Sequence, residues 1–205
     1  MGKRCSSVWP VPVETSLNQV NEKSTKRKKK VKKNSRKILN SEYPSLTEAQ
    51  RESIQGRIFV SNRSAAKDQD LIDALDVTAI MSIGGGTGGD LPGINFFHIG
   101  IKDRSDTDYL PVFRQAAEFA APIIASGANI LVHCQGGMHR SPVVAAALLV
   151  RFGMLSADEA MESVKAARSI ADFSTHDNYL ANELKKYEVE VREDLDSVLK
   201  SDHAI

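Results

Sequence analysis

The segment ILVHCQGGMHRSP, residues 130–142, brings together side chains whose types and spacing could do chemistry. Cys134 stands at the end of an apolar run, and Arg140 follows six residues later across a loop that contains two glycines. An apolar helix is predicted to begin directly after this loop, so the backbone N–H groups of the loop would converge at a helix N-terminus. Such a point binds a phosphate dianion, and its positive potential also stabilises a thiolate.

Each residue type in this loop suits one part of phosphate chemistry. Gly136 and Gly137 permit the tight backbone that turns the amides inward, and Arg140 can bind two phosphate oxygens at once, which a lysine cannot do. A Cys134 thiolate directed at a bound phosphorus would form a covalent phosphocysteine. Free cysteines are commonly buried as structural thiols, but these neighbours favour a nucleophile at Cys134.

The segments on either side of the loop alternate between strand-like and helix-like patterns. Short apolar runs predict buried strands, and longer runs with apolar residues at helical spacing predict helices. The predicted strands are 57–61, 77–83, 94–99 and 129–133, and the predicted helices are 65–76, 110–126, 142–152, 156–168 and 176–199. This alternation predicts an α/β fold with a central, mostly parallel, twisted sheet flanked by helices.

Two helix signals and one glycine-rich segment refine this outline. Pro122 predicts a kink or an early end of its helix, and Ser156 with Glu159 forms a capping-box pattern. The glycine-rich segment 84–89 does not match a nucleotide-binding loop, because Asp90 stands where such a loop requires lysine. The segment is interpreted as a flexible connection between two elements.

The pattern His133-Cys134-x5-Arg140-Ser141 resembles the active-site loop of the cysteine-based protein tyrosine phosphatase superfamily. The compact, atypical dual-specificity branch is similar over about residues 54–190, in the segments GRIFVSNRSAAKDQDLIDALDVTAIMSI, FFHIGIKDRSDTDYLPVF and VVAAALLVRFGMLSADEAMESVKAAR. The resemblance implies hydrolysis of phosphotyrosine and phosphoserine or phosphothreonine in a phosphoprotein substrate, with no metal and no cofactor. It also implies a phosphate-binding loop made of Gln135, Gly136, Gly137, Met138, His139 and Arg140.

The resemblance assigns further roles to residues around the cysteine. The family protonates the leaving oxygen with an aspartic acid on a loop that precedes the cysteine. Asp103 stands 31 residues before the cysteine and directly after an apolar strand pattern, which matches the position of that acid. Asp103 is therefore the expected general acid and would then activate water, whereas Asp106 and Asp108 are expected to cap the following helix. Ser141 would stabilise the departing thiolate, and His133 would orient the loop.

His139 departs from the family pattern, because most members have a small serine or glycine at this position. Its imidazole could add a cation near the phosphate or point to solvent. A histidine here resembles the phosphatases of inositol pyrophosphates, so hydrolysis of inositol phosphates, inositol pyrophosphates or phosphoinositides is one alternative. However, the uncharged Gln135 and Met138 stand where those enzymes have basic residues. A catalytically weak, phospho-binding pseudophosphatase is the other alternative, although the cysteine, the arginine and the acid are all present.

The charge of the chain is divided between a basic tail and an acidic remainder. The formal net charge is +1, but residues 1–40 hold 12 Lys and Arg against 2 Asp and Glu, while residues 41–205 hold 15 against 24. The tail includes KSTKRKKKVKKNSRK and has almost no apolar clustering, which predicts disorder. We therefore expect a disordered basic N-terminal arm, residues 1–45, and a catalytic domain, residues 54–195.

The arm begins with MGKRCSS, which matches the pattern for N-myristoylation. Gly2 is the acylation site in this pattern, and Cys5 is close enough to accept a palmitoyl chain. One myristoyl chain anchors a protein only marginally, and a basic run supplies the second signal that stable attachment needs. The arm is therefore expected to contact an anionic membrane surface. A nuclear localisation signal is the alternative reading of the basic run, and no nucleic-acid partner is expected.

Cysteine content and hydropathy bound the expected location of the protein. The chain has two cysteines, Cys5 and Cys134, which lie far apart in unlike contexts, so a disulfide framework is not expected. No stretch approaches the roughly 18 apolar residues that span a bilayer, and the N-terminus lacks the apolar run of a secretory signal. The expected location is intracellular: cytoplasmic with membrane association, or alternatively nuclear.

Overall fold

The computed structural model describes residues 13–15, 57–85, 91–104 and 106–202 of the 205-residue chain. Its centre is a five-stranded sheet in the order β1-β2-β5-β3-β4, in which neighbouring strands are parallel. The strands are β1 (Val13–Thr15), β2 (Ile58–Asn62), β3 (Val77–Ile83), β4 (Asn95–Ile99) and β5 (Asn129–Cys134). The predicted α/β fold with a parallel sheet is confirmed.

The central strands are largely apolar because each of their faces packs against a core. In β2, Ile58 and Val60 face the larger core, whereas Phe59 between them faces the smaller one. This alternation follows from the two-residue repeat of side-chain direction along a strand, and β5 alternates in the same way. A parallel sheet that is covered on both faces accounts for the nearly continuous apolar runs of the sequence.

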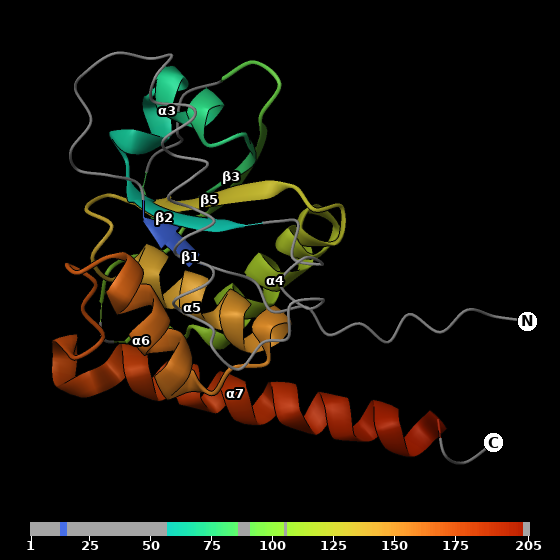
Figure 1. Cartoon of the computed structure of the whole chain (residues 1–205). Helices are drawn as coiled ribbons and strands as arrows, with labels where there is room; N and C mark the ends of the chain where they lie inside the picture. The colour runs from blue at the N-terminus through green and yellow to red at the C-terminus, as the bar shows by residue number, and fades with distance from the viewer. Residues whose placement is uncertain (1–12, 16–56, 86–90, 105, 203–205) are drawn as a thin grey trace, which may run out of the picture.

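Helices cover the two faces of the sheet unequally, as Figure 1 shows. A short 3₁₀ helix, η1 (Ala65–Lys67), and the helix α3 (Gln69–Ala74) cover one face. The other side carries α4 (Leu110–Ala125), α5 (Arg140–Gly153) and α6 (Ala157–Ala167), with α7 (Thr175–Asp202) packed outside them. The larger core therefore lies between the sheet and the layer of α4, α5 and α6.

The predicted helix over 65–76 is wrong in its continuity. The structure divides the segment into η1 and α3, because Asp68 adopts an extended backbone between them. The Oδ1 of Asp68 accepts a hydrogen bond from the backbone N–H of Leu71 at 3.1 Å and so caps α3. A capping aspartate satisfies one of the unpaired N–H groups at a helix start, which favours a new helix here over continuation of the old one.

The two helix signals read from the sequence have different outcomes. The capping box is confirmed: Ser156 accepts from the backbone N–H of Glu159, and the Glu159 carboxylate accepts from the backbone N–H of Ser156. The early boundary at Pro122 is wrong, since α4 continues three residues further, to Ala125. The Pro122 carbonyl accepts from Ser126 N, so the turn that follows the proline is formed and the helix continues past it.

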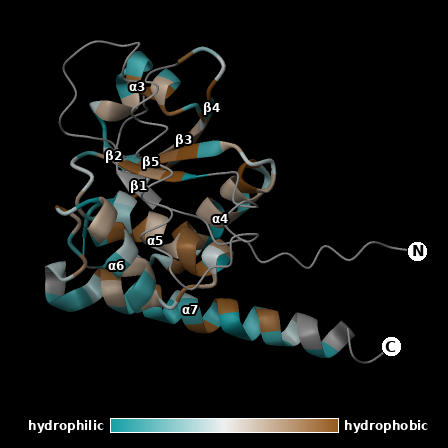
Figure 2. Cartoon of the chain, in the orientation of Figure 1, coloured by the Kyte–Doolittle hydropathy of each residue, from teal (hydrophilic) through white to brown (hydrophobic). Residues whose placement is uncertain are grey.

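The long helix α7 is amphipathic, and in Figure 2 hydrophilic and hydrophobic residues alternate along it. Leu180, Leu184, Tyr187 and Val191 are buried, and their spacing of three or four residues places them on one face. This face packs against α5, α6 and α4. The helix predicted over 176–199 is therefore confirmed and is one residue longer at its start and three residues longer at its end.

Part of the predicted N-terminal arm belongs to the sheet. The strand β1 lies within residues 1–45 and pairs in parallel with β2, Val13 opposite Ile58, so these three residues correct the expectation of a wholly disordered arm. The remaining residues of the arm, including Gly2 and Cys5, lie outside the described residues. Across the described ranges, none of the helices combines the length and the apolar character needed to cross a membrane.

Candidate active site

The candidate site lies at the carboxyl edge of the parallel sheet, where the loops after four strands meet. The central strand β5 ends at Cys134, and its neighbours β2 and β3 lead directly into Arg63 and Gly84. The edge strand β4 leads into the loop that carries Asp103. In open parallel sheets, ligands bind outside the carboxyl ends of the strands, so this topology brings residues far apart in sequence to one place.

Cys134 is buried, with 4% of its surface exposed, and two hydrogen-bond donors approach its sulfur. The backbone N–H of Gly137 lies 3.2 Å from Sγ, and the Ser141 hydroxyl lies 3.3 Å from it. The same hydroxyl is 3.3 Å from the carbonyl oxygen of Ser61 on β2, so its single proton has two acceptors within reach. Both donors would stabilise negative charge on the sulfur, which is the role expected of Ser141.

The loop backbone is held in place by Arg168, which the sequence analysis did not identify. Arg168 is 3% exposed, and its guanidinium donates to the carbonyl oxygens of Gly136 and Gly137. Since these carbonyls point toward Arg168, the following amides face the opposite way, toward the centre of the loop. Burial lowers the pKa of Arg168, and Cys134 acts in the opposite direction. The only signal in the sequence was an arginine at the end of the predicted helix 156–168.

Gly137 fits this arrangement where another residue would not. Its φ is +67°, a left-handed conformation that side chains rarely adopt. A Cβ at this position would stand 2.6 Å from the Arg168 guanidinium and 2.6 Å from the Ser61 carbonyl oxygen. Glycine therefore serves both the backbone turn and the close approach of Arg168.

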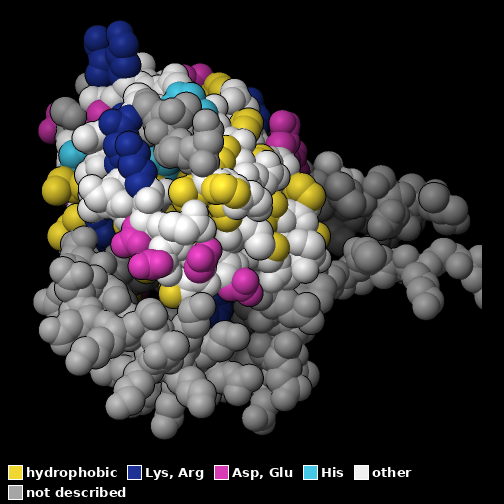
Figure 3. Space-filling model, turned by 90° about the horizontal axis from the view of Figure 1, so that it is seen from above, with side chains coloured by type: hydrophobic (Ala, Val, Ile, Leu, Met, Phe, Trp, Pro, Cys, Tyr) yellow, Lys and Arg dark blue, Asp and Glu magenta, His cyan; other side chains and the backbone are white. Residues whose placement is uncertain are grey.

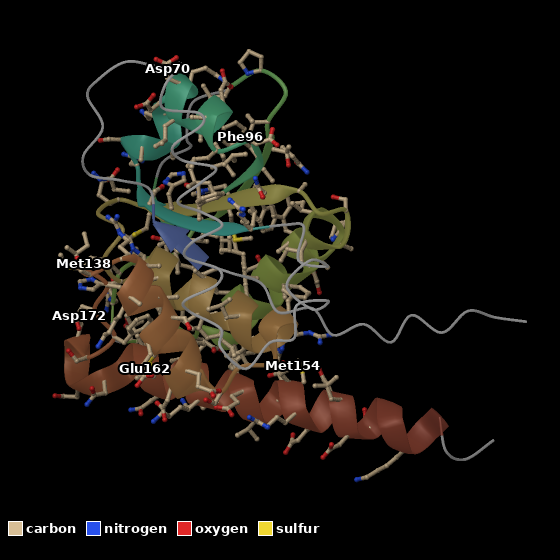
Figure 4. All side chains as sticks on the ribbon, in the orientation of Figure 1. Asp70, Phe96, Met138, Met154, Glu162 and Asp172 are labelled. Carbon is tan, nitrogen blue, oxygen red and sulfur yellow. The ribbon has the colours of Figure 1, made fainter. Side chains whose placement is uncertain are left out.

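The next carbonyl of the loop is also bound by the segment between α6 and α7. The backbone N–H of Asp172 donates to the Met138 carbonyl oxygen at 2.9 Å. Figure 4 shows Met138 and Asp172 close together at the same end of the molecule. The carbonyls of three consecutive loop residues thus have donors from residues 168–172, while Met138 itself leaves 41% of its surface exposed at the rim.

Arg140 begins α5, and its guanidinium lies over the backbone of Gly84. A Cβ at Gly84 would stand 1.9 Å from Arg140 Nη1, so the arginine occupies space that only a glycine leaves open. The Nε of Arg140 lies 3.4 Å from Asp103 Oδ2. The sequence pattern predicts only that the glycine-rich segment connects two elements. Gly84, the first residue of that segment, follows β3. Gly84 also leaves room for Arg140, the candidate phosphate-binding side chain.

The structure separates the three aspartates of the loop after β4. Asp103 turns toward Arg140, and its side chain is 36% exposed. Asp106 forms a two-pronged ion pair with Arg104 at the surface, so the expectation that it caps a helix is wrong. Asp108 does accept from the backbone N–H of Leu110, the first residue of α4, at 3.2 Å. The favoured candidate acid is therefore the one that faces the cysteine loop.

The helix α7 fixes the end of this loop. The Tyr179 hydroxyl donates to the Thr107 carbonyl oxygen, and the buried Glu183 carboxylate accepts from the backbone N–H of Tyr109 at 3.2 Å. Thr107 in turn donates its hydroxyl to the Lys102 carbonyl oxygen at 3.0 Å. These contacts anchor the chain on both sides of Asp106 and hold the Asp103 segment beside the site.

His139 does not point freely into solvent, which is one of the two orientations considered from the sequence. Its Nδ1 lies 3.2 Å from Asp103 Oδ2, and its Nε2 lies 3.2 Å from Thr175 Oγ1 at the start of α7. The ring is 22% exposed and connects the loop after β4 with α7. It thus contacts the candidate acid rather than standing free in solvent.

His133 is buried under the loop, with 1% of its surface exposed. Neither ring nitrogen has a hydrogen-bond partner among the described residues. Burial lowers the pKa of His133 to about 4, because a charged imidazolium loses its hydration there. The ring is therefore neutral at pH 7 and adds no charge to the site.

A pH dependence of stability follows from His133. In the unfolded chain a histidine binds a proton near pH 6.5, whereas the folded chain resists protonation down to about pH 4. Between these values the unfolded state binds more protons, so the free energy of unfolding falls as the pH falls, by about 3 kcal/mol in total from this group. We expect His133→Gln to unfold with a shallower pH dependence between pH 6.5 and 4, measured by urea titration. An unchanged slope in that interval would contradict this origin.

The predicted site residues thus fall into three groups. Gly137 and Ser141 contact the Cys134 sulfur, and Arg140 and His139 both lie beside Asp103. The side chains of Gln135 and Met138 point outward, and the Gly136 carbonyl faces Arg168. Gly2 and Cys5, the candidate lipidation residues, lie outside the described part of the chain.

Comparisons with known proteins match the chain to one family. A family model described as dual specificity phosphatase, catalytic domain, matches residues 58–190. Human dual specificity protein phosphatase 1 is 31% identical over 114 residues, which cover 55% of this chain and 31% of that protein. The chain therefore matches less than a third of that relative's length.

Solved structures share the fold. A mouse putative dual specificity phosphatase complexed with zinc tungstate is 25% identical, with a TM-score of 0.63 over 67% of this chain and 86% of that chain. Human DUSP28 is 24% identical, with a TM-score of 0.62 over 67% of this chain and 94% of that chain. The second likeness concerns the fold alone.

Proposed function

The chain belongs to the dual-specificity phosphatase family, and from that premise we propose that it hydrolyses phosphotyrosine and phosphoserine or phosphothreonine in phosphoprotein substrates. The observation that carries the proposal is the placement of Cys134. Its sulfur receives hydrogen bonds from Gly137 N–H and the Ser141 hydroxyl, and Arg140, at the end of the same loop, lies with its Nε 3.4 Å from the Asp103 carboxylate. This arrangement suits transfer of a phosphoryl group to sulfur.

In the first step of the proposed reaction, the Cys134 thiolate attacks phosphorus while the loop amides and Arg140 hold the phosphoryl oxygens. The S–P bond forms, the bond from phosphorus to the leaving oxygen breaks, and Asp103 gives that oxygen a proton. In the second step, water attacks phosphorus and gives its proton to Asp103. The S–P bond breaks, phosphate is released, and the sulfur returns to a thiolate that Ser141 and Gly137 stabilise.

The alternatives have less support from the site. For inositol phosphates, inositol pyrophosphates or phosphoinositides, a loop with more positive charge would be expected, yet Gln135 and Met138 are uncharged and both ring nitrogens of His139 are engaged elsewhere. A weak, phospho-binding pseudophosphatase would be expected to lack a reacting group, whereas the cysteine, the arginine and the acid are all present.

One panel of substrates tests the proposal against these alternatives. Purified protein would be incubated with phosphotyrosine, phosphoserine and phosphothreonine peptides, with inositol polyphosphates, and with vesicles that contain phosphoinositides. We expect phosphate release from the phosphopeptides, with Cys134→Ser as the background. Release from the inositides alone would replace the proposed substrate class, and release from none of the substrates would favour a binding module.

The role of Asp103 can be tested by leaving-group dependence. We expect Asp103→Asn to slow phosphoserine hydrolysis on the order of 10²-fold or more, because an alkoxide leaves poorly without a proton. The burst of nitrophenol from p-nitrophenyl phosphate, which reports the transfer step, should change less since nitrophenolate leaves unprotonated. Asp106→Asn is the matched control, as its carboxylate pairs with Arg104 at the surface. If Asp106→Asn reproduced the pattern and Asp103→Asn did not, the acid would be misassigned.

We also propose that the N-terminal arm attaches the protein to an anionic membrane through myristate on Gly2, with palmitate on Cys5 and the basic run as further signals. The support is the motif MGKRCSS and the ten Lys and Arg between Lys23 and Lys37. Each basic residue near an anionic surface adds about 1 kcal/mol of attraction. By contrast, the described surface above α3 carries acidic as well as basic side chains (Figure 3), and residues 41–205 hold an excess of nine acidic groups.

The variant Gly2→Ala tests this attachment. Without myristate, Cys5 would no longer be held at the membrane for palmitoylation, so only electrostatic attraction would remain. We expect most of the variant to move to the soluble fraction at physiological salt, with a small salt-sensitive portion still bound, while the wild type sediments with membranes. Accumulation of both forms in the nucleus would instead identify the basic run as a localisation signal.

A further inference from the structure

His139 connects two segments that approach the site from different directions. Through Nδ1 it contacts the Asp103 carboxylate on the loop after β4, and through Nε2 it contacts the Thr175 hydroxyl at the start of α7. Thr175 in turn lies 2.6 Å from Asp172 Oδ2. A continuous chain of hydrogen bonds therefore runs from Asp172 through Thr175 and His139 to the candidate acid, Asp103. Which group donates in each bond depends on which of these groups carry a proton.

The direction is set at Asp172, which is an acceptor on both oxygens. Its Oδ1 receives the backbone N–H of Ser174 at 2.8 Å and the Ser174 hydroxyl at 2.7 Å. The hydrogen bond from Thr175, followed by these two bonds from Ser174, holds the pKa of Asp172 well below its usual value. Because the carboxylate carries no proton, the Thr175 hydroxyl must donate its own proton to Asp172. Thr175 Oγ1 can then only accept from His139, so Nε2 must carry a proton.

The proton on the other side of the ring follows from the same reasoning. With Nε2 protonated, a neutral His139 leaves Nδ1 as an acceptor, and Asp103 Oδ2 must then be the donor. A charged His139 donates from Nδ1 to an ionised Asp103. In either case one proton lies between Nδ1 and Oδ2. A bare Nδ1 facing an ionised carboxylate would place two acceptors 3.2 Å apart with no proton between them.

We propose that His139 and Asp103 hold a single shared proton between Nδ1 and Oδ2, and that His139 thereby supplies the proton that Asp103 gives to the leaving oxygen. The inference rests on the proposed phosphatase function and extends it to a residue that the sequence places only in the phosphate-binding loop. Asp103 remains the group that meets substrate, and His139 is a positioning residue that acts through it.

The proton balance closes over the two steps of the reaction. When the S–P bond forms and the P–O bond breaks, the shared proton passes through Asp103 to the leaving oxygen. This leaves neutral His139 beside ionised Asp103, a pair with no proton and a strong tendency to accept one. Attack by water on the phosphocysteine then returns one proton to the pair as the S–P bond breaks, so no outside acid is required.

A shared proton changes the pH range over which the acid works. A lone aspartic acid loses its proton near pH 4 and an imidazolium near pH 6.5, so a pair that includes an imidazole keeps its last proton to higher pH. The charged groups that face the ring are Asp103 from the loop after β4, Asp172 from the segment before α7 and, beyond Asp103, Arg140 of α5. Removal of the imidazole should therefore lower the upper pH limit of activity.

The first test is the pH profile of His139→Gln. Glutamine keeps a donor and an acceptor at this position but does not titrate, so it separates proton supply from simple support. With a phosphoserine peptide, we expect the descending limb of the kcat profile to move toward acid by about one pH unit or more. We also expect kcat at pH 7 to fall about tenfold or more. The nitrophenol burst from p-nitrophenyl phosphate and the Kd for tungstate should stay within about threefold.

Two results would overturn the proposal. An unmoved descending limb would mean that His139 does not share the titrating proton. Equal losses with the peptide, with the aryl phosphate and in tungstate affinity would mean that the ring only supports the loop.

The second test reads the ring itself and needs no substrate. In the ¹⁵N spectrum of the full chain, with the His139 signals assigned through the His139→Gln variant, the neutral ring should carry its proton on Nε2. Thr175→Val removes the acceptor at Nε2, so we expect a mixture of the two tautomers in that variant. A neutral wild-type ring protonated on Nδ1 would overturn the proposal. Because this readout is independent of turnover, a wild type that hydrolyses nothing would overturn only the proposed function.

Discussion

Replacement of Cys134 by serine is expected to reduce phosphate release to the uncatalysed background, while the phosphate-binding loop stays intact. A serine hydroxyl in this position is a far weaker nucleophile than a thiolate and has no adjacent base to activate it. The fold should survive, because the serine oxygen can accept from Gly137 N–H and Ser141 much as the sulfur does. The loss would therefore concern the chemical step and not binding.

The affinity for an oxyanion separates these two effects. We expect the Kd of tungstate, measured by calorimetry, to be unchanged or smaller in Cys134→Ser. The variant removes the sulfur, which would repel the anion in the thiolate form that the proposed reaction requires, and it keeps Arg140 and the loop amides. Cys5→Ser is the matched control, because Cys5 is the other cysteine of the chain and lies in the arm. Appreciable turnover by Cys134→Ser, or equal loss in Cys5→Ser, would reject Cys134 as the nucleophile.

The substitution Arg140→Lys is expected to have the second largest effect, on the order of 10²-fold or more in kcat/KM. A lysine preserves the charge but not the planar fork that binds two phosphoryl oxygens. It would also leave empty the space beside Gly84 that the guanidinium fills, and it would remove the contact between Arg140 Nε and Asp103. Binding of the phosphoryl group and placement of the acid should therefore suffer together.

Steady-state kinetics and tungstate affinity would check this expectation. In Arg140→Lys, kcat should fall, KM should rise and the Kd for tungstate should rise with it. Arg104→Lys provides a matched control on the neighbouring loop, where the arginine pairs with Asp106 at the surface and should tolerate the change. If Arg140→Lys kept the kcat/KM of the wild type, a single positive charge would suffice and the bidentate role of Arg140 would be wrong.

Most elements of the fold were predictable because their signals are local. The strand over 77–83 and the capping box at Ser156 and Glu159 are confirmed, since a short apolar run and a cap depend on residues that are neighbours in the chain. The errors also have local causes. Asp68 breaks the predicted helix 65–76 because its carboxylate caps a new one, and Pro122 does not end α4 because the helix packs on through Ile123 into the core.

The candidate site was predictable where the residues lie on one loop. The expectation that Cys134, Arg140 and Ser141 would meet followed from their spacing between a strand and a helix. In the structure, Ser141 contacts the Cys134 sulfur, and Arg140 lies beside Asp103. Asp103 was placed by resemblance, as three aspartates share that loop and local patterns do not separate them. In the structure, Arg104 draws Asp106 to the surface, and Asp103 turns to Arg140 and His139.

The sequence by itself determined which residues could do chemistry, because a strand, a glycine-containing loop and a helix in succession bring their amides and side chains to one point. Only the tertiary structure decided what supports them. Arg168 lies 31 residues after Gly137, yet its guanidinium binds the Gly137 carbonyl oxygen, and Thr175 lies 36 residues after His139. Such contacts depend on how α6 and α7 pack against α5. The spacing of apolar residues along the chain predicts helices and strands, but it does not predict which residues of different elements will come into contact. The direction of the His139 ring, and with it the shared proton that we infer, is a consequence of that packing.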